Sequence, residues 1–355
     1  MISLADRLAA RTLEFVNIAS ESHHEEVIRA HVQWLVPDGY QAEFLGDDAF
    51  LFAPERRPGL PLVVLAGHYD TVPAQGNLPG RIEDGVVHGL GAADMKGGVA
   101  VALELVRDLM VEPPSACDVA LLVFGREELP SQFNPLPALF EGSRLIHDAS
   151  LAIVLEPTAG AIHAGCVGNM TARVTFPGVS GHSARPWLSQ NAIHAAIDGL
   201  AQIAALPRRE VVISELPFYE VVSVTLLEAG IADNVVPDSA TATINYRYTP
   251  DRTSDEAQAY LRSLLPDAVG VEIISDSPPA RVAADAPLVR ALRDAGDLAL
   301  EPKQAWTNVA DFTARGIDAV NFGPGDPRFA HRRDEQVEIA ALVHCYETLR
   351  RFFSG

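Results

Sequence analysis

Short, nearly continuous apolar runs separated by helical patterns are the feature that most limits how this chain can fold. The runs are residues 61–67 (PLVVLAG), 118–125 (DVALLVFG) and 151–155 (LAIVL). Runs of this length without polar alternation are typical of strands buried on both faces of a parallel sheet. Residues 97–110 (GGVAVALELVRDLM) have the apolar spacing of a helix packed on such a sheet. We therefore predict an α/β domain with a mainly parallel mixed sheet.

The middle of the chain has a different pattern. Residues 239–248 (SATATINYRY) alternate strictly between apolar and polar side chains, as a strand does when one face of its sheet is solvated. The elements around it are predicted in the order strand, helix, strand, strand, helix, strand, which is the ferredoxin-like order. They are predicted at residues 170–176, 191–206, 221–227, 239–248, 254–265 and 271–275. This region is therefore predicted to be a smaller α+β domain inserted into the first.

The α/β pattern returns from about residue 280. We predict a helix at 287–298, a strand at 319–322 and a closing helix that begins near 335. A length of 355 residues accommodates one large domain or two of ordinary size. We predict that residues 1–166 and 280–355 form the larger domain and that residues 167–279 form the inserted one.

Charge and cysteine content exclude several classes of protein. The chain has 47 acidic against 27 basic side chains, a formal net charge of -20, which repels nucleic acid and anionic membrane surfaces. The three cysteines form no C-x-x-C pair, which argues against a disulfide framework. Any bound metal is therefore expected to have nitrogen and oxygen ligands.

The chain shows no targeting or membrane signal. Residues 1–15 have an amphipathic helix pattern with charged side chains and lack the uncharged core of a signal peptide. No later segment approaches the length of a membrane span. We therefore expect a cytoplasmic protein that does not associate with membranes.

Polar residues follow the predicted strands, where open α/β sheets place their ligands. His68 and Asp70 follow the first run and point to one face of an extended chain. Asp70 could orient a metal-bound His68, although the pair could also be a core histidine satisfied by a carboxylate. Asp94 lies in a glycine-rich turn before a helix, where it could bridge two metals about 3.5–4 Å apart or act as an ordinary N-cap.

Three further acids complete this pattern. Glu127 and Glu128 follow the second run, and Glu156 ends the third. Because neighbouring side chains diverge, one of the adjacent pair could bind metal while the other transfers a proton. The alternative is a solvated acidic pair. The glycines at 89–98 match neither the Walker nor the Rossmann spacing, so phosphate binding is not indicated.

Taken together, these strings resemble the co-catalytic metallopeptidase family that includes succinyl-diaminopimelate desuccinylase, acetylornithine deacetylase, aminoacylase and glutamate carboxypeptidase. The motifs are GHYDTVP from residue 67, GLGAADMKGG from residue 89, EE at 127, LEPT from residue 155 and a late histidine, His331. The resemblance covers essentially the whole chain. It implies a zinc-peptidase-like catalytic domain and an inserted domain that serves for dimerisation.

The resemblance also implies a metal site with two Zn²⁺ ions per chain, for which Co²⁺ can substitute. His68 and Glu156 would bind one ion, Glu128 and His331 the other, and Asp94 both. Imidazole and carboxylate ligands suit zinc without any thiolate. The family places a cis peptide bond directly after the bridging aspartate.

Catalytic roles follow from the same resemblance. Glu127 would be the general acid/base that takes a proton from the attacking water and returns it to the departing amine. Asp70 would orient His68. His182, in the inserted domain, would reach the partner subunit's site and stabilise the oxyanion, which implies a homodimer; a surface histidine in a turn is the alternative.

Two residues are candidates for binding the substrate. Arg247 lies on the polar face of the alternating strand and by resemblance binds a substrate carboxylate, although by pattern it could equally be a solvated sheet residue. Asn234, in the string NVVP, is a candidate for the same pocket. The expected substrate is a small N-acyl amino acid.

One position departs from the family pattern. Asp311 stands where relatives on the desuccinylase branch carry an arginine. Exchanging a cation for an anion reverses the local attraction for a substrate carboxylate. Either Arg315, Arg328 or Arg332 compensates, or the substrate differs.

The stretches 181–196, 234–252 and 319–331 are most similar to the desuccinylase branch. That similarity implies hydrolysis of N-succinyl-L,L-diaminopimelate to succinate and L,L-diaminopimelate, a step of lysine biosynthesis. The alternatives are an acetylornithine deacetylase, or another N-acyl-amino-acid amidohydrolase or carboxypeptidase. A non-catalytic dimeric binding protein would have lost a ligand or the proton-transferring glutamate, and all six positions are filled.

Overall fold

The computed structural model describes residues 2–355 and divides the chain into two compact units. The first comprises Met1–Gly165, Ala283–Glu301 and Asp311–Gly355, and the second Cys166–Val282 and Pro302–Ala310. The opening helix is α1 (Leu4–Val16); the predicted start at residue 1 lies outside the described residues. Within residues 2–355, helices that combine the length and the apolarity needed to cross a membrane are absent.

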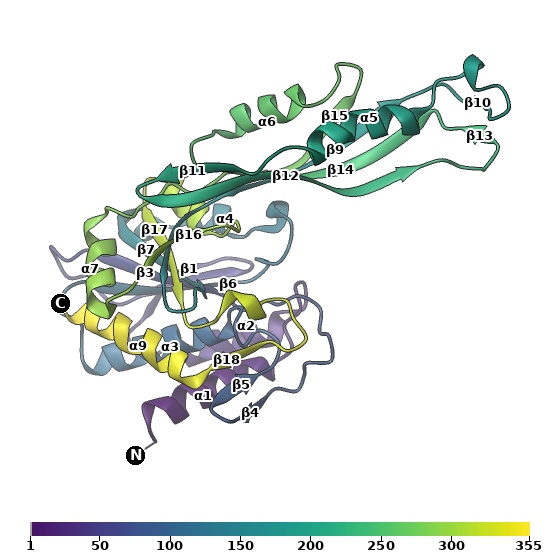
Figure 1. The fold of residues 1–355 in the computed structure, drawn as a ribbon. Helices are drawn as coiled ribbons and strands as arrows, with labels where there is room; N and C mark the ends of the chain where they lie inside the picture. The colour runs from purple at the N-terminus through teal and green to yellow at the C-terminus, as the bar shows by residue number, and fades with distance from the viewer. Residues whose placement is uncertain (1) are drawn as a thin grey trace. The chain divides into compact units, whose positions relative to one another are not determined.

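An eight-stranded sheet forms the core of the first unit, in the order β1-β2-β6-β3-β7-β17-β8-β16 (Figure 1). The strands are β1 (Gln41–Leu45), β2 (Ala49–Ala53), β3 (Leu62–His68), β6 (Asp118–Phe124), β7 (Ala149–Pro157), β8 (Ile162–Cys166), β16 (Leu300–Lys303) and β17 (Asp318–Gly323). The central strands β6, β3, β7 and β17 pair in parallel, whereas β1 with β2, β2 with β6 and β8 with β17 pair antiparallel. Every residue of β3 and β6 is buried, which confirms the predicted strands and the mainly parallel mixed sheet.

Helix α3 (Lys96–Val111) contacts β3, β6 and β7 on one side and α1 and α9 (Ile339–Ser354) on the other. Glycine allows this close approach, because a Cβ at Gly98 would lie 2.5 Å from the carbonyl oxygen of Leu155. Among the described residues, four shorter α-helices lie outside the inserted segment: α2 (Glu26–Leu35), α4 (Leu136–Gly142), α7 (Pro287–Gly296) and α8 (Val309–Thr313).

A small sheet joins two segments that lie far apart in the sequence. β4 (Arg81–Glu83) and β5 (Val86–His88) form a hairpin, and β18 (Gln336–Glu338) pairs antiparallel with β5. The closing helix was predicted to begin near residue 335. This start is wrong, because residues 336–338 are extended in β18 and the helix begins at Ile339. The pairing holds the segment after His331 beside the turn that leads to Asp94.

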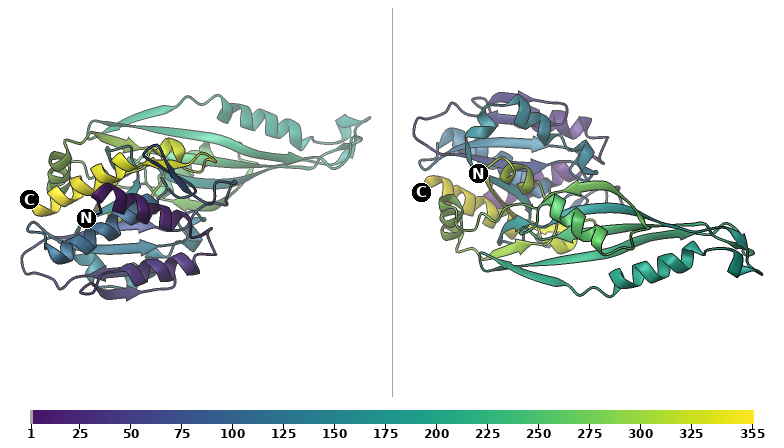
Figure 2. Two further views of the ribbon diagram at one scale, coloured as in Figure 1. Left: turned by 90° about the horizontal axis from the view of Figure 1, so that it is seen from below. Right: turned by 90° about the horizontal axis from the view of Figure 1, so that it is seen from above.

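The second unit is an antiparallel sheet in the order β11-β12-β14-β9-β15. Its elements are β9 (Gly168–Pro177), α5 (Ala192–Ala204), β11 (Arg209–Ile213), β12 (Leu216–Ala229), β14 (Ser239–Tyr248), α6 (Ser254–Ser263) and β15 (Gly270–Ser277). Helices α5 and α6 cover one face of this sheet (Figure 1; Figure 2, seen from above). On that face, alternate side chains of β9 and β14 form a buried cluster with the two helices. This confirms the ferredoxin-like prediction, with β11 as an added strand.

Candidate metal centre

β3 ends at His68, so a wholly buried strand carries this imidazole to the carboxyl end of the parallel sheet. Its Nδ1 lies 3.1 Å from the backbone oxygen of Asp70 and 3.4 Å from Asp70 Oδ1. The Asp70 carboxylate also accepts the backbone N–H groups of Glu127 and Glu128, each at 3.2 Å, and the Ser22 hydroxyl at 2.7 Å. Asp70 therefore ties His68 to the turn that follows β6.

The two histidines of the site face opposite oxygens of one carboxylate. His68 Nε2 lies 3.3 Å from Asp94 Oδ1 and 3.8 Å from Glu156 Oε1. His331 Nε2 lies 3.5 Å from Asp94 Oδ2 and 3.0 Å from Glu128 Oε1. The structure thus brings all five predicted metal-binding side chains into one cluster.

The spacing of this cluster fits a metal. Two ligand atoms bound tetrahedrally to zinc at 2.0–2.1 Å lie about 3.3–3.4 Å apart. The four nitrogen–oxygen distances, 3.0 to 3.8 Å, bracket that value. Imidazole and carboxylate are also suitable donors for zinc. Among residues 2–355, His68, Asp94 and Glu128 are the one group of such side chains whose ligand atoms all lie within 4.8 Å of one another.

The charges of the cluster favour a cation. Burial lowers the pKa of His68, but hydrogen bonds with Asp70 and Asp94 outweigh it and hold this pKa well above its usual value. The hydrogen bond with Glu128 is the main reason that the pKa of His331 rises to about 9. The carboxylates crowded around the two imidazoles therefore favour a positive charge at this place, which a bound cation would supply.

Glu127 extends from the same turn. Burial raises the pKa of its carboxyl well above the usual value, and the neighbouring Glu156 and Glu128 raise it further. The preceding residue, Arg126, has a left-handed backbone (φ +60°) and its guanidinium pairs with Asp48. This ion pair anchors the turn from which Glu127 and Glu128 project.

The turn before α3 corrects one interpretation and confirms another. Asp94 is not the N-cap of α3, because that position belongs to Met95, whose side chain makes no capping bond. The peptide bond between Asp94 and Met95 is cis, as the resemblance implied.

Two residues that contact the site were missed in the sequence. Ser22 binds Asp70, and Glu335 accepts the backbone N–H groups of Gly91, Ala93 and Asp94. No motif marks either residue. The sequence marks Glu335 only by its position, four residues after the predicted ligand His331.

Two of the predicted residues of the second unit are neighbours. His182 lies on β10 (Gly181–His182), which pairs with β13 (Val235–Val236). It is exposed, and its Nδ1 accepts the N–H of Ala184 at 3.0 Å. The backbone oxygen of Asn234 accepts the N–H of Ser183 at 3.0 Å, so Asn234 and His182 lie side by side.

Arg247 lies elsewhere in the second unit. It pairs with Asn169 and Val221 in the sheet, and its Nε donates to Asn245 Oδ1 at 2.9 Å. The end of β14 nearest β10 is Ser239, eight residues away, which at about 3.3 Å per residue is on the order of 26 Å. Arg247 and the pair His182–Asn234 are therefore not brought together within this unit.

The departure at Asp311 has local partners. Asn134 Nδ2 donates to Asp311 Oδ2 at 3.0 Å. Arg315 Nη1 donates to the backbone oxygen of Asp311 at 2.8 Å and lies 4.0 Å from Oδ1. Arg328 and Arg332 instead pair with aspartates two residues away. Of the three arginines considered, Arg315 is the one beside Asp311.

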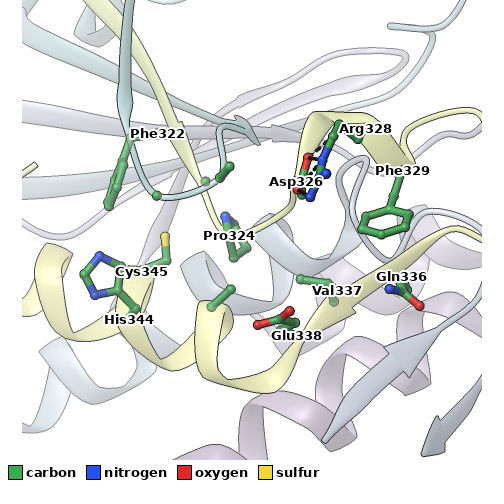
Figure 3. A pocket seen from close by; sticks show the side chains of 14 residues that line it. Phe322, Pro324, Asp326, Arg328, Phe329, Gln336, Val337, Glu338, His344 and Cys345 are labelled. Carbon is green, nitrogen blue, oxygen red and sulfur yellow. Dashed lines mark hydrogen bonds and ion pairs between the residues drawn. The ribbon is translucent and has the colours of Figure 1, made fainter. Parts of the chain in front are cut away.

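A cavity of about 380 Å³ lies between the segment after β17 and helix α9 (Figure 3). Phe322, Phe329, Val337 and His344 line it, with the Asp326–Arg328 ion pair at its margin. None of the five predicted metal ligands lines this cavity, so it is separate from the cluster.

Residues 64–354 match peptidase family M20/M25/M40. The chain belongs to this family and is a metal-dependent amide hydrolase. Succinyl-diaminopimelate desuccinylase of Corynebacterium glutamicum is 37% identical over 297 residues, covering 82% of this chain and 80% of the relative. A Mycobacterium tuberculosis protein provisionally named succinyl-diaminopimelate desuccinylase is 38% identical over 347 residues, 97% of each chain. Aminopeptidase PepT of Bacillus cereus, 18% identical, shares the fold with a TM-score of 0.80 over 100% of this chain and 99% of its own.

Proposed function

We propose that this enzyme hydrolyses N-succinyl-L,L-diaminopimelate to succinate and L,L-diaminopimelate, a step of lysine biosynthesis. The observation that carries the proposal is the similarity to relatives of that name, 37–38% identical over most of the chain. The polar cluster at the end of β3 supplies the chemistry that amide hydrolysis requires.

We assign two zinc ions to this cluster, with cobalt as a substitute. His68 and Glu156 would hold one ion, His331 and Glu128 would hold the other, and Asp94 would contribute to both. The two oxygens of Asp94 facing two different imidazoles support this division. A dinuclear metal-binding M20 peptidase of Bacillus subtilis has the same fold at 14% identity, with a TM-score of 0.72. Metal bound here supplies Lewis-acid chemistry that makes water more acidic and polarises a carbonyl.

Glu127 transfers the proton in this scheme. Its carboxylate accepts the proton of the attacking water and then donates it to the amine nitrogen of the departing diaminopimelate. Asp70 holds the backbone N–H of Glu127 and the Nδ1 side of His68, so one carboxylate orients both the proton carrier and a metal ligand.

The second unit is proposed to mediate homodimerisation. Among residues 2–355, β11 pairs with residues 216–220 of β12, and residues 221–229 of β12 pair with β14 alone. Leu226 and Leu227 on this edge are exposed. An unpaired strand edge is a template for pairing with another chain. In the dimer, His182 would act in the partner's site, and Arg247 and Asn234 would bind substrate carboxylates.

The remaining proposals concern the domain boundaries and the cellular compartment. We propose residues 1–166 and 280–355 as the catalytic domain, residues 167–279 as the inserted dimerisation domain, and the cytoplasm as the compartment. Size measurement in solution at several protein concentrations tests the dimer, which predicts twice the 38.1 kDa of one chain.

The test of the substrate compares two amides. Zinc-loaded enzyme is given N-succinyl-L,L-diaminopimelate and N-acetylornithine side by side, with a chelator-treated control. We expect preference for the succinylated substrate and loss of cleavage after chelation. Preference for N-acetylornithine would instead establish the deacetylase, for which the carboxylate at Asp311 is the favouring observation.

The role of Glu127 is tested by Glu127→Gln. Turnover should fall by about 10²- to 10⁴-fold, the usual contribution of a general acid/base, while metal content stays unchanged. Glu141→Gln, at an exposed position of α4, serves as the matched control and should keep normal turnover. Near-normal activity of the Glu127 variant would show that another group transfers the proton.

A further inference from the structure

One buried carboxylate holds the turn that presents Asp94. Glu335 Oε2 accepts the N–H of Gly91 at 2.9 Å, and its Oε1 accepts the N–H groups of Ala93 and Asp94 at 3.1 and 3.0 Å. The side chain is almost completely buried, with 2% of the residue exposed. Three backbone donors that would otherwise be buried without a partner thus converge on this single side chain.

The turn held in this way ends at the residue whose carboxylate lies between the two histidines. The backbone N–H of Asp94 binds Glu335, while its two side-chain oxygens face His68 and His331. The buried Lys96, at the start of α3, donates from Nζ to the carbonyl oxygen of Ile18. Glu335 thus contacts the backbone of the turn, while the side chain of Asp94 contacts the two histidines.

Glu335 and His331 reach the site on one short segment of the chain. Glu335 follows His331 by four residues, and β18 then pairs with β5, which leads into the turn. A single segment therefore carries one predicted metal ligand and the support for another.

We propose that Glu335 is a positioning residue that sets the metal affinity of the site by fixing the turn 91–94, so that the Asp94 carboxylate faces both imidazoles. Glu335 does not itself contact metal. The inference rests on the proposed metal site and adds to it a residue that controls its geometry.

Two substitutions separate geometry from charge. Glu335→Gln removes the charge and keeps one oxygen for Ala93 and Asp94, but turns an NH₂ group toward the N–H of Gly91. Glu335→Asp keeps the charge but is one methylene shorter, so it cannot reach all three donors. Glu338→Gln, three residues later at the end of β18, is the matched control, because Glu338 is exposed and its side chain makes no capping bond.

The measurement is the Zn²⁺ dissociation constant of the full-length protein, obtained by competition with a chromophoric chelator. Positioning predicts that both Glu335 variants bind zinc about 10- to 100-fold more weakly, as loss of a partner that orients a ligand usually does. The control should match the unmodified chain. The melting temperature of each metal-free variant is measured in parallel, so that affinity is determined below it.

Each alternative gives a different result. If Glu335→Asp keeps the unmodified affinity while Glu335→Gln loses it, charge alone matters and the positioning role is wrong. If both variants melt earlier but bind zinc normally while folded, Glu335 is purely structural. If the unmodified chain binds no zinc, the proposed metal site fails first and the inference falls with it.

Discussion

The two histidines of the metal centre lie in very different surroundings. The His68 side chain is 1% exposed, at the end of a buried strand and tied on one side to Asp70. The His331 side chain is 54% exposed and sits on a residue with a left-handed backbone (φ +60°). The carboxylates of the two halves differ little, since Glu156 is 7% and Glu128 8% exposed.

The difference separates a rigid half of the site from an adjustable one. The ring of His68 is restricted without metal, because it is buried at the end of β3 and its Nδ1 contacts Asp70. His331 has solvent on one side, so its ring has more freedom to lose when metal binds. In the proposed two-zinc site, we therefore expect the ion on the His68 side to bind more tightly.

Replacing each histidine in turn gives the largest expected effect. Both His68→Ala and His331→Ala should reduce turnover by more than about 100-fold, since removing a ligand exceeds the loss of a residue that only supports one. After dialysis, His331→Ala should retain close to one zinc per chain and His68→Ala clearly less, as measured by elemental analysis. Equal retention by the two variants would remove the distinction between the halves.

Asp70→Asn tests whether the rigid half and the proton carrier share one support. The amide would turn an NH₂ group toward the N–H of Glu127 or Glu128, so zinc affinity should fall by about 10- to 100-fold. Asp84→Asn in the exposed β4–β5 turn is the control. If stepwise zinc titration shows weakening of the first ion only, Asp70 acts through His68 and not through the turn after β6.

Ser22→Ala should have the smallest effect. It removes one hydrogen bond to Asp70, which contributes about 0.5–1.5 kcal/mol, or about a two- to tenfold loss of zinc affinity. Ser131→Ala, at an exposed position, should change nothing. A loss as large as that of Asp70→Asn would mean that the hydroxyl, and not the carboxylate alone, orients His68.

The sequence predicted the fold well where each element follows one rule. The buried runs became β3, β6 and β7, and the alternating segment became β14 with the predicted bounds. β1, β2 and β18 were not predicted, because they are short edge or hairpin strands whose pairing depends on distant partners. The closing helix was placed too early for the same reason.

The sequence predicted those parts of the site that consist of side chains in recognisable motifs. It did not predict the contacts that side chains make with distant backbone groups. The five proposed ligands could be singled out because each follows a strand or belongs to a recognisable string, and the structure brings their side chains together. Glu335 escaped because its partners are N–H groups 241 to 244 residues away, which any residue type supplies. Ser22 is similarly distant from Asp70, by 48 residues.

The place of β17 in the large sheet has a consequence for how the enzyme is made. β17 lies between β7 and β8, yet the ribosome produces it more than 150 residues later, after the whole second unit. A nascent chain that ends before residue 318 therefore lacks the strand that lies between β7 and β8, and it also lacks His331. The first unit therefore remains incomplete while the second is synthesised, and the metal cluster can be completed only after His331 has been added to the chain.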